Sequence, residues 1–245
     1  MKTIKKIIAL SLVFASLLIG ACVKSTCEEV STSTNTVYIF VDYTDQLNFN
    51  KLKENWAKDY KTINQLFPMQ SCQGGKLRMI PVTNLGSNEI AAMSYEALPA
   101  SLNEFNPPID YTLFKRDFKK SMETFLLREA KELPSTHLFE PMCQAFNQLQ
   151  TSTDAGRKIA IFYSDMLENS DGGSLYSKKV DPKVLLKQWQ ATTGCTLPDM
   201  TGLEVYIVNH RKERTNQLIR KSNLFWKDAF TKQGAKVVLT SSLEL

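Results

Sequence analysis

Four oxygen-bearing side chains stand directly after an apolar run at residues 37–41, and they are Asp42, Thr44, Asp45 and Gln46. A second apolar run, at residues 158–163, leads into Ser164 and Asp165. Carboxylate, hydroxyl and amide oxygens are ligands that hard divalent cations such as Mg²⁺ prefer. The two segments therefore predict a metal site, provided that the fold brings their ends together. The same residues also suit a polar turn that caps a following helix, and from the residues alone both interpretations stay open.

Alternating strands and helices have to position these side chains. Strands are expected where nearly every position is apolar, at residues 37–41, 77–82, 158–165, 203–210 and 235–240. Helices are expected at residues 49–67, 114–126, 137–150, 181–192 and 213–232. Residues 89–95 are expected to return as an antiparallel edge strand, and Pro81 argues against a central place for the strand at 77–82. This alternation predicts a doubly wound α/β fold, with a mostly parallel central sheet and helices on both faces.

In a doubly wound sheet, ligands bind outside the carboxyl ends of the strands, where the winding reverses. Asp42 and Asp165 both lie at that edge, and a helix led by Ser135 or Thr136 precedes the second of them. This arrangement resembles the von Willebrand factor type A domain. In that family a strand ends in D-x-[ST]-x-S, a threonine opens the helix before the fourth strand, and an aspartate ends that strand. The resemblance spans roughly residues 36–240.

The resemblance implies a domain that binds and does not catalyse. Its metal ligands would be Asp42, Thr44, Thr136 and Asp165, with Gln46, Asp45 and Ser135 as secondary candidates. The ion would be Mg²⁺ or Mn²⁺, and water or an acidic side chain of a partner protein would complete its coordination shell. The sequence departs from the family motif at Gln46, which replaces the second serine, and at Asp45, which adds a negative charge.

Three alternatives use the same segments. In a degenerate phosphatase of the haloacid dehalogenase type, Asp42 would be the nucleophile and Ser164 would contact the phosphate. Thr44 stands where that family has its second acid. In a zinc or manganese site, His137 and His210 would add nitrogen ligands. A purely structural component of a cell envelope would use the polar residues for neither purpose.

Residues 1–21 are expected to be a signal peptide. A short lysine-containing segment precedes an apolar run at residues 7–19, which is too short to span a membrane. The stretch IGAC, residues 19–22, resembles the bacterial lipobox. The resemblance implies a lipid on Cys22 that anchors the protein to a membrane of the bacterial cell envelope, on the periplasmic face or at the cell surface. Ordinary cleavage beside an incidental cysteine is the alternative.

Residues 22–36 are rich in Ser and Thr and predict a flexible tether, which leaves residues 37–245 as a single domain. Loss of the three lysines of the signal peptide would lower the formal charge from +5 to +2, and no clustered basic face remains for a nucleic acid. An exported chain with four further cysteines is expected to form at least one disulfide. The candidates are Cys27, Cys72, Cys143 and Cys195, and Cys72 with Cys143 is the first pairing to consider.

Overall fold

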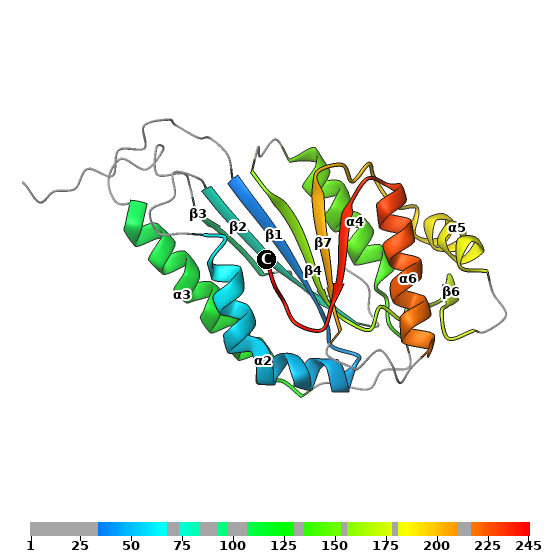
Figure 1. Cartoon of the computed structure of the whole chain (residues 1–245), viewed down its shortest axis with the longest axis horizontal. Coiled ribbons are helices and arrows are strands. Elements are labelled where there is room, and N and C mark those ends of the chain that lie inside the picture. The colour runs from blue at the N-terminus through cyan, green and yellow to red at the C-terminus, as the bar shows by residue number, and fades with distance from the viewer. Residues whose placement is uncertain are drawn as a thin grey trace, which may run out of the picture. The chain divides into compact units, whose positions relative to one another are not determined.

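The computed structural model describes residues 34–67, 74–83, 93–97, 107–129, 135–152, 156–177, 181–209 and 217–245 (Figure 1). Four residues that the sequence singles out lie outside these ranges, namely Cys22, Cys27, Cys72 and His210. Of the helices in the described ranges, none is both long enough and apolar enough to cross a membrane.

A six-stranded sheet forms the centre of the fold, in the order β3-β2-β1-β4-β7-β8. The strands are β1 (Thr34–Asp42), β2 (Gly74–Val82), β3 (Met93–Ala97), β4 (Lys158–Tyr163), β7 (Leu203–Val208) and β8 (Lys236–Thr240). All neighbouring strands are parallel except β2 and β3, which form the predicted antiparallel edge. The chain winds outward from β1 to β3 and then returns to β4, so the winding reverses between β1 and β4.

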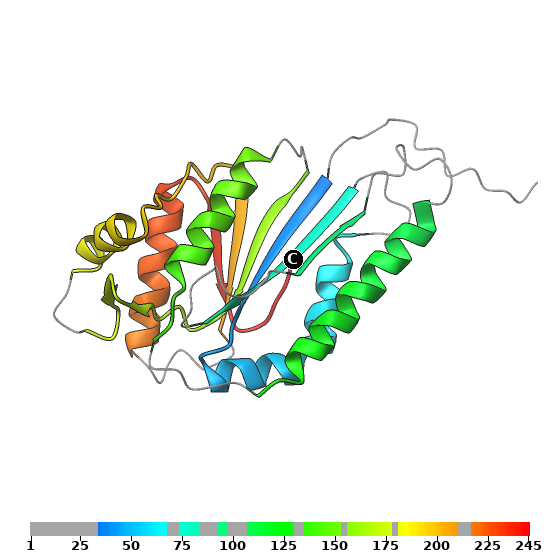
Figure 2. The ribbon, with the colours of Figure 1, turned by 180° about the vertical axis from the view of Figure 1, so that it is seen from behind.

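The described helices cover both faces of this sheet. They are α2 (Gln46–Asn64), α3 (Pro107–Leu126), α4 (Phe139–Thr151), α5 (Pro182–Thr193) and α6 (Gln217–Lys232). Figures 1 and 2 show α2 and α3 on one side of the sheet, and α4, α5 and α6 on the other. The predicted doubly wound α/β fold is confirmed. A short hairpin of β5 (Asn169–Ser170) and β6 (Gly173–Ser174) follows β4 and was not predicted.

Both faces of β1 are covered, and all nine of its residues are buried. Val37, Ile39 and Val41 pack into the apolar cluster beneath α2 and α3. Tyr38 and Phe40 pack into the opposite cluster, beneath α4, α5 and α6. Because successive side chains of a strand point to opposite faces, a strand between two cores has to be apolar at every position. This explains the uninterrupted apolar run that precedes Asp42.

Two details of the strands differ from the expectation. β1 begins at Thr34, so the last three residues of the predicted tether belong to the sheet. β2 lies inside the sheet although it contains Pro81. Its pairing with β3 runs from Gly75 to Met79, so Pro81 lies beyond the described ladder with β3. A missing backbone N–H at that position removes no hydrogen bond to β3, which explains why the proline is tolerated.

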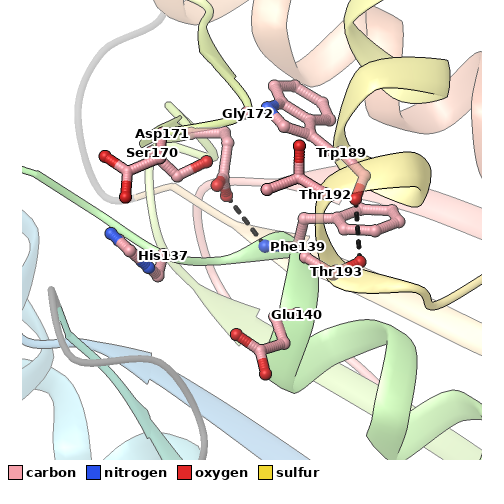
Figure 3. A pocket seen from close by; sticks show the side chains of 10 residues that line it. His137, Phe139, Glu140, Ser170, Asp171, Gly172, Trp189, Thr192 and Thr193 are labelled. Atoms are coloured by element: carbon pink, nitrogen blue, oxygen red, sulfur yellow. Dashed lines mark hydrogen bonds between the residues drawn. The ribbon is translucent and has the colours of Figure 1, made fainter.

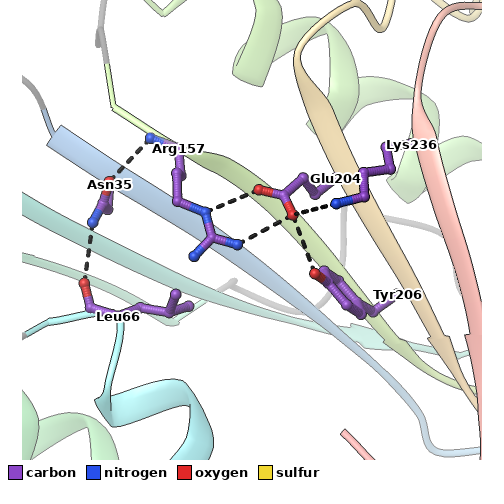
Figure 4. A network of polar contacts seen from close by, with 6 residues as sticks. All are labelled: Asn35, Leu66, Arg157, Glu204, Tyr206 and Lys236. Atoms are coloured by element: carbon purple, nitrogen blue, oxygen red, sulfur yellow. Dashed lines mark hydrogen bonds and ion pairs between the residues drawn. The ribbon is translucent and has the colours of Figure 1, made fainter. Parts of the chain in front are cut away.

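A polar network joins the amino ends of the strands (Figure 4). Arg157 Nε and Nη2 donate to the two carboxylate oxygens of Glu204, at 2.9 and 3.1 Å, and Lys236 Nζ lies 3.9 Å from the same carboxylate. Asn35 of β1 donates to the Leu66 carbonyl at 3.1 Å and accepts from the backbone N–H of Arg157 at 3.0 Å. Exposed ion pairs contribute little to stability, so the network mainly fixes how these strand ends meet.

One disulfide lies on the α4 side of the sheet. Cys143 of α4 is bonded to Cys195, which follows α5, with an S–S distance of 2.09 Å. The prediction of at least one disulfide is confirmed, and the pairing of Cys72 with Cys143 is wrong. The reason is tertiary: α4 and α5 pack in the same apolar cluster, and Cys195 packs against it. This places the segment after α5 beside Cys143.

Candidate functional site

Asp42 is the last residue of β1 and is only 1% exposed. Its Oδ1 accepts hydrogen bonds from Thr44 N at 2.9 Å, from Thr44 Oγ1 at 2.7 Å and from Asp45 N at 3.3 Å. Its Oδ2 accepts from Ser164 Oγ at 2.7 Å. Ser164 directly follows β4, so this last bond joins the carboxyl ends of the two strands between which the winding reverses.

Thr136 extends this arrangement from the segment before α4. Its Oγ1 lies 2.7 Å from Thr44 Oγ1. Because Thr44 has one hydroxyl proton and donates it to Asp42, Thr136 has to be the donor in this contact. Two backbone hydrogen bonds with Asn169, at 2.9 and 3.0 Å, hold Thr136 in place. We call Asp42, Thr44, Thr136 and Ser164 the Asp42 cluster; three of its four residues were predicted metal ligands.

The secondary candidates have other roles. Gln46 is the exposed first residue of α2, and Ser135 is half-buried beside Thr136. Asp45 Oδ1 accepts from Asn48 N at 3.1 Å, so Asp45 is the N-cap of α2. For Asp45 the capping interpretation is therefore confirmed. The second serine of the family motif, whose place Gln46 takes, therefore has no counterpart in the Asp42 cluster.

Asp165 lies in the buried loop that follows β4. Its Oδ1 accepts from the backbone N–H two residues later, at 3.0 Å. The next residue, Met166, has φ of 62°, an uncommon conformation for a residue other than glycine. The Met166 carbonyl accepts from Ser222 Oγ and from Trp226 Nε1, both in α6. The loop is thus held by α6 in the conformation that presents Ser164 to Asp42.

The charge of Asp42 is costly where it lies. Burial raises the pKa of Asp42, hydrogen bonds from Thr44 and Ser164 oppose that change, and the nearby charge of Asp45 adds to it. The result is a raised pKa. A carboxylate with this balance of effects is stabilised by any cation placed beside it, because the cation offsets the lost hydration.

A second D-x-T turn provides an internal comparison. Asp199 Oδ1 accepts from Thr201 N at 2.9 Å and from Thr201 Oγ1 at 2.7 Å, the same contacts that Asp42 makes with Thr44. Asp199, however, is exposed. The turn alone is therefore an ordinary local motif, and the features that distinguish Asp42 are its burial and its connection to Ser164 and Thr136.

Glu168 is a buried acid that the sequence analysis missed. It is 1% exposed, and its Oε2 accepts from Leu138 N at 2.7 Å and from Phe139 N at 2.8 Å. These amides begin α4, whose N-cap residue Leu138 makes no side-chain capping bond. Burial raises the pKa of Glu168 to about 7, against the lowering effect of hydrogen bonds from Ser170 and from the two amides. A helix start without a capping side chain was the available signal, and the acid that replaces it lies 30 residues away.

A cavity of ≈ 260 Å³ lies beside Glu168, between the start of α4, the β5–β6 hairpin and α5 (Figure 3). Its lining includes three carboxylates, two aromatic rings and an imidazole, namely Glu140, Glu168, Asp171, Phe139, Trp189 and His137. His137 directly follows Thr136, so the cavity and the Asp42 cluster are connected through one short segment. Both lie on the carboxyl side of the sheet.

The donor atoms of the Asp42 cluster fit Mg²⁺ or Mn²⁺ better than zinc. Adjacent ligands of an octahedral Mg²⁺ ion lie about 2.9 Å apart, since each is about 2.05 Å from the metal. The Asp42–Thr44 and Thr44–Thr136 oxygen distances are both 2.7 Å, close to that spacing. Within the described ranges, no group of three or more His, Cys, Asp or Glu side chains is placed to hold a metal. An ion here would therefore depend on at most two carboxylates together with hydroxyls and water, which is a shell that Mg²⁺ accepts and zinc rarely uses.

Fold and site together define a doubly wound α/β protein with a buried carboxylate–hydroxyl cluster at the carboxyl edge of its sheet, and this is compatible with a von Willebrand factor type A-like fold. No family model and no curated protein matches the chain. Among solved structures, it is similar to the human COPII-coat protein Sec24c, with a TM-score of 0.43 and 10% identity over 89% of this chain. It is also similar to the pilus adhesin SpaC from Lactobacillus rhamnosus GG, with a TM-score of 0.44 and 9% identity over 84% of this chain. The matched regions span 30% and 28% of those two proteins, and we base the fold class on strand order and pairing instead.

Proposed function

We propose that this chain is a lipid-anchored protein of the bacterial cell envelope that binds a partner protein at the carboxyl edge of its sheet. We further propose that it is of the von Willebrand factor A-like type and that Mg²⁺ or Mn²⁺ takes part in binding. Asp42, Thr44 and Thr136 would hold the ion, with Asp165 as a further candidate from the loop after β4. The bound ion would offer a coordination position to a carboxylate of the partner.

One observation carries the proposal: oxygen atoms from three separate segments meet at the point where the winding reverses. Thr44 begins the turn after β1, Thr136 precedes α4, and Ser164 follows β4. All three are linked to Asp42 by hydrogen bonds of 2.7 Å, directly or through Thr44. A cap for α2 needs none of these long-range contacts, because Asp45 already provides it.

The same geometry favours binding over phosphoryl transfer. A nucleophilic carboxylate needs one oxygen that can reach the phosphorus atom. Asp42 is 1% exposed, and both of its oxygens accept hydrogen bonds from the protein. Thr44 donates to Asp42 and takes the place where the phosphatase family has its proton-donating acid. We therefore propose that the chain is not an enzyme.

Magnesium or manganese is expected to raise the melting temperature of the full chain, and Asp42→Asn is expected to abolish that rise. Ligand binding stabilises a fold by mass action, so an ion at about five times its Kd adds about 1 kcal/mol, or roughly 2–4 °C. The asparagine keeps the size of the side chain and an acceptor for Thr44 but removes the charge that holds the ion. Melting curves in EDTA and in millimolar Mg²⁺ or Mn²⁺ measure the difference.

Asp199→Asn is the matched control, because it changes the same D-x-T turn at an exposed position. It should leave the metal-dependent rise intact. A parent protein whose melting temperature ignores both ions would contradict the metal site. An equal loss of the rise in both variants would show that the ions act on surface charge in general.

The anchor is tested by Cys22→Ser. This variant should accumulate as an unprocessed precursor or be released without lipid, because serine has no thiol to carry the acyl chain. Stable anchoring needs more than one chain, and its loss should move the protein out of the membrane fraction. Cell fractionation and electrophoretic mobility provide the measurement. A variant that stays as firmly bound as the parent, with the same mobility, would overturn the lipoprotein proposal.

A further inference from the structure

The cavity beside Glu168 is lined by three acidic side chains that no basic side chain of the described ranges neutralises. Glu140, Glu168 and Asp171 line it, and no lysine or arginine of the described ranges forms an ion pair with any of the three. The hydrogen bonds that Glu168 accepts come from uncharged groups, the amides of α4 and the Ser170 side chain. Buried charge without a counter-charge is costly, and a cation entering the cavity would remove that cost.

The walls of the cavity are aromatic and rigid. Phe139 and Trp189 are both 1% exposed, and their ring centroids lie 5.9 Å apart. Trp189 Nε1 donates to the Gly173 carbonyl at 3.2 Å, which fastens the β5–β6 hairpin to α5. The hairpin packs so closely that a Cβ on Gly172 would meet Trp189 Cδ1 at 2.8 Å. The two buried rings thus form a rigid apolar floor beside the carboxylates, and the carboxylates supply the charge that would attract a cation.

The spacing of the carboxylates distinguishes between kinds of cation. The three acids share one cavity, yet they belong to no group of His, Cys, Asp or Glu side chains within the described ranges that could hold a metal ion. A small divalent ion needs its oxygen ligands within 2.6 Å or less. An organic cation with several hydrogen-bonding N–H groups can instead contact carboxylates that are too far apart to share one small ion.

We propose that this cavity binds an alkylammonium group, such as the side chain of a lysine presented by the partner protein. The site would lie beside the Asp42 cluster, with His137 following Thr136 in the shared segment. A partner would then be recognised by two neighbouring charges, an acid at the metal and a lysine in the cavity. The cavity itself does not depend on the metal; the proposed function enters only in naming a protein as the source of the ammonium group.

The probe is n-butylammonium chloride, which has the length and charge of a lysine side chain, and 1-butanol is its uncharged analogue. Saturation-transfer NMR on the full chain should show transfer to n-butylammonium that saturates with concentration, and weaker transfer to 1-butanol. Asp171→Asn and Glu140→Gln should each weaken n-butylammonium binding about three- to fivefold, the effect of losing one partly exposed ion pair. Glu168→Gln should weaken it as well, provided that circular dichroism shows that the variant is folded.

The controls separate this site from the metal site. Asp199→Asn removes an exposed acid elsewhere and should not change the affinity. Asp42→Asn should still bind n-butylammonium in a saturable way even if it abolishes the effect of Mg²⁺. Equal transfer in the parent, Asp171→Asn and Glu140→Gln proteins would overturn the proposal. Displacement of n-butylammonium by Mg²⁺ in the Asp42→Asn variant would also overturn it, because the cavity would then be a metal site.

Discussion

Loss of the Cys143–Cys195 disulfide is expected to lower the free energy of unfolding by about 4 kcal/mol. The bond closes a loop with a sequence separation of 52 residues, and the chain-entropy model assigns a restriction of that length about this value. The loop contains the end of α4, β4, the β5–β6 hairpin and α5. Removing the bond therefore frees the unfolded chain across this whole segment, which includes Ser164 of the Asp42 cluster.

Urea unfolding of the parent and of the double variant Cys143→Ala/Cys195→Ala measures this effect. The midpoint should fall in the variant, and dithiothreitol should shift the midpoint of the parent but not that of the variant. The hydrogen bonds that join the Asp42 cluster involve neither cysteine, so the shift caused by Mg²⁺ should survive in the variant if it is present in the parent. Equal midpoints for the two proteins under oxidising conditions would contradict the assigned contribution.

Stability is expected to fall as the pH rises from about 5 to 8, and Glu168 is expected to cause much of that change. Its pKa is raised from the ordinary 4.5 to about 7, chiefly because burial penalises the charged form. A raised pKa means that the native state binds the proton more tightly than the unfolded state does. Protonated Glu168 therefore stabilises the fold fully below the ordinary pKa of 4.5. This stabilisation is lost as the pH rises to the native pKa of about 7, and above that pH Glu168 causes no further change. The pKa shift corresponds to a change of about 3 kcal/mol at most in the free energy of unfolding.

Glu168→Gln isolates this contribution, because the amide has the same size, accepts from the amides of α4 and does not titrate. Urea unfolding of both proteins at pH 5 and pH 8 provides the comparison. The parent should lose more free energy of unfolding between these pH values than the variant, by up to about 3 kcal/mol. If both proteins lose the same amount, Glu168 does not titrate in this range and its pKa is not raised.

The fold was predictable because strands between two cores leave an unmistakable pattern. Residues 37–41 of β1 are all apolar, and the runs that became β4 and β7 are similar. Amphipathic segments between them gave the helices, and their alternation gave the winding. The predictions were wrong where the pairing with a neighbouring strand decides the structure. Pro81 is tolerated inside the sheet because the ladder with β3 ends at Met79, and no local pattern could reveal this.

The residues of the site likewise fall into those that the local sequence predicts and those that it does not. Asp42 and Thr44 are two residues apart, and their contact follows from a local turn that also occurs at Asp199. Thr136 was found through a family resemblance, since its contact with Thr44 spans 92 residues. Glu168 was missed because its role is defined by amides 29 and 30 residues earlier in the chain. Residues whose partners lie far along the chain are not identified by their immediate neighbours in the sequence.

The central place of β1 has a consequence for the order of folding. β1 is made first, but one of its two neighbours is β4, and the Ser164–Asp42 hydrogen bond closes a separation of 122 residues. Pairing over such distances is slow, since the entropy of closing the loop is lost before the contacts form. Until β4 arrives, one edge of β1 is a row of unpaired apolar residues open to other chains. The proposed binding of a partner at Asp42 would therefore occur only after folding is complete, because an incompletely folded chain does not yet have the surface that Asp42 and Ser164 form together.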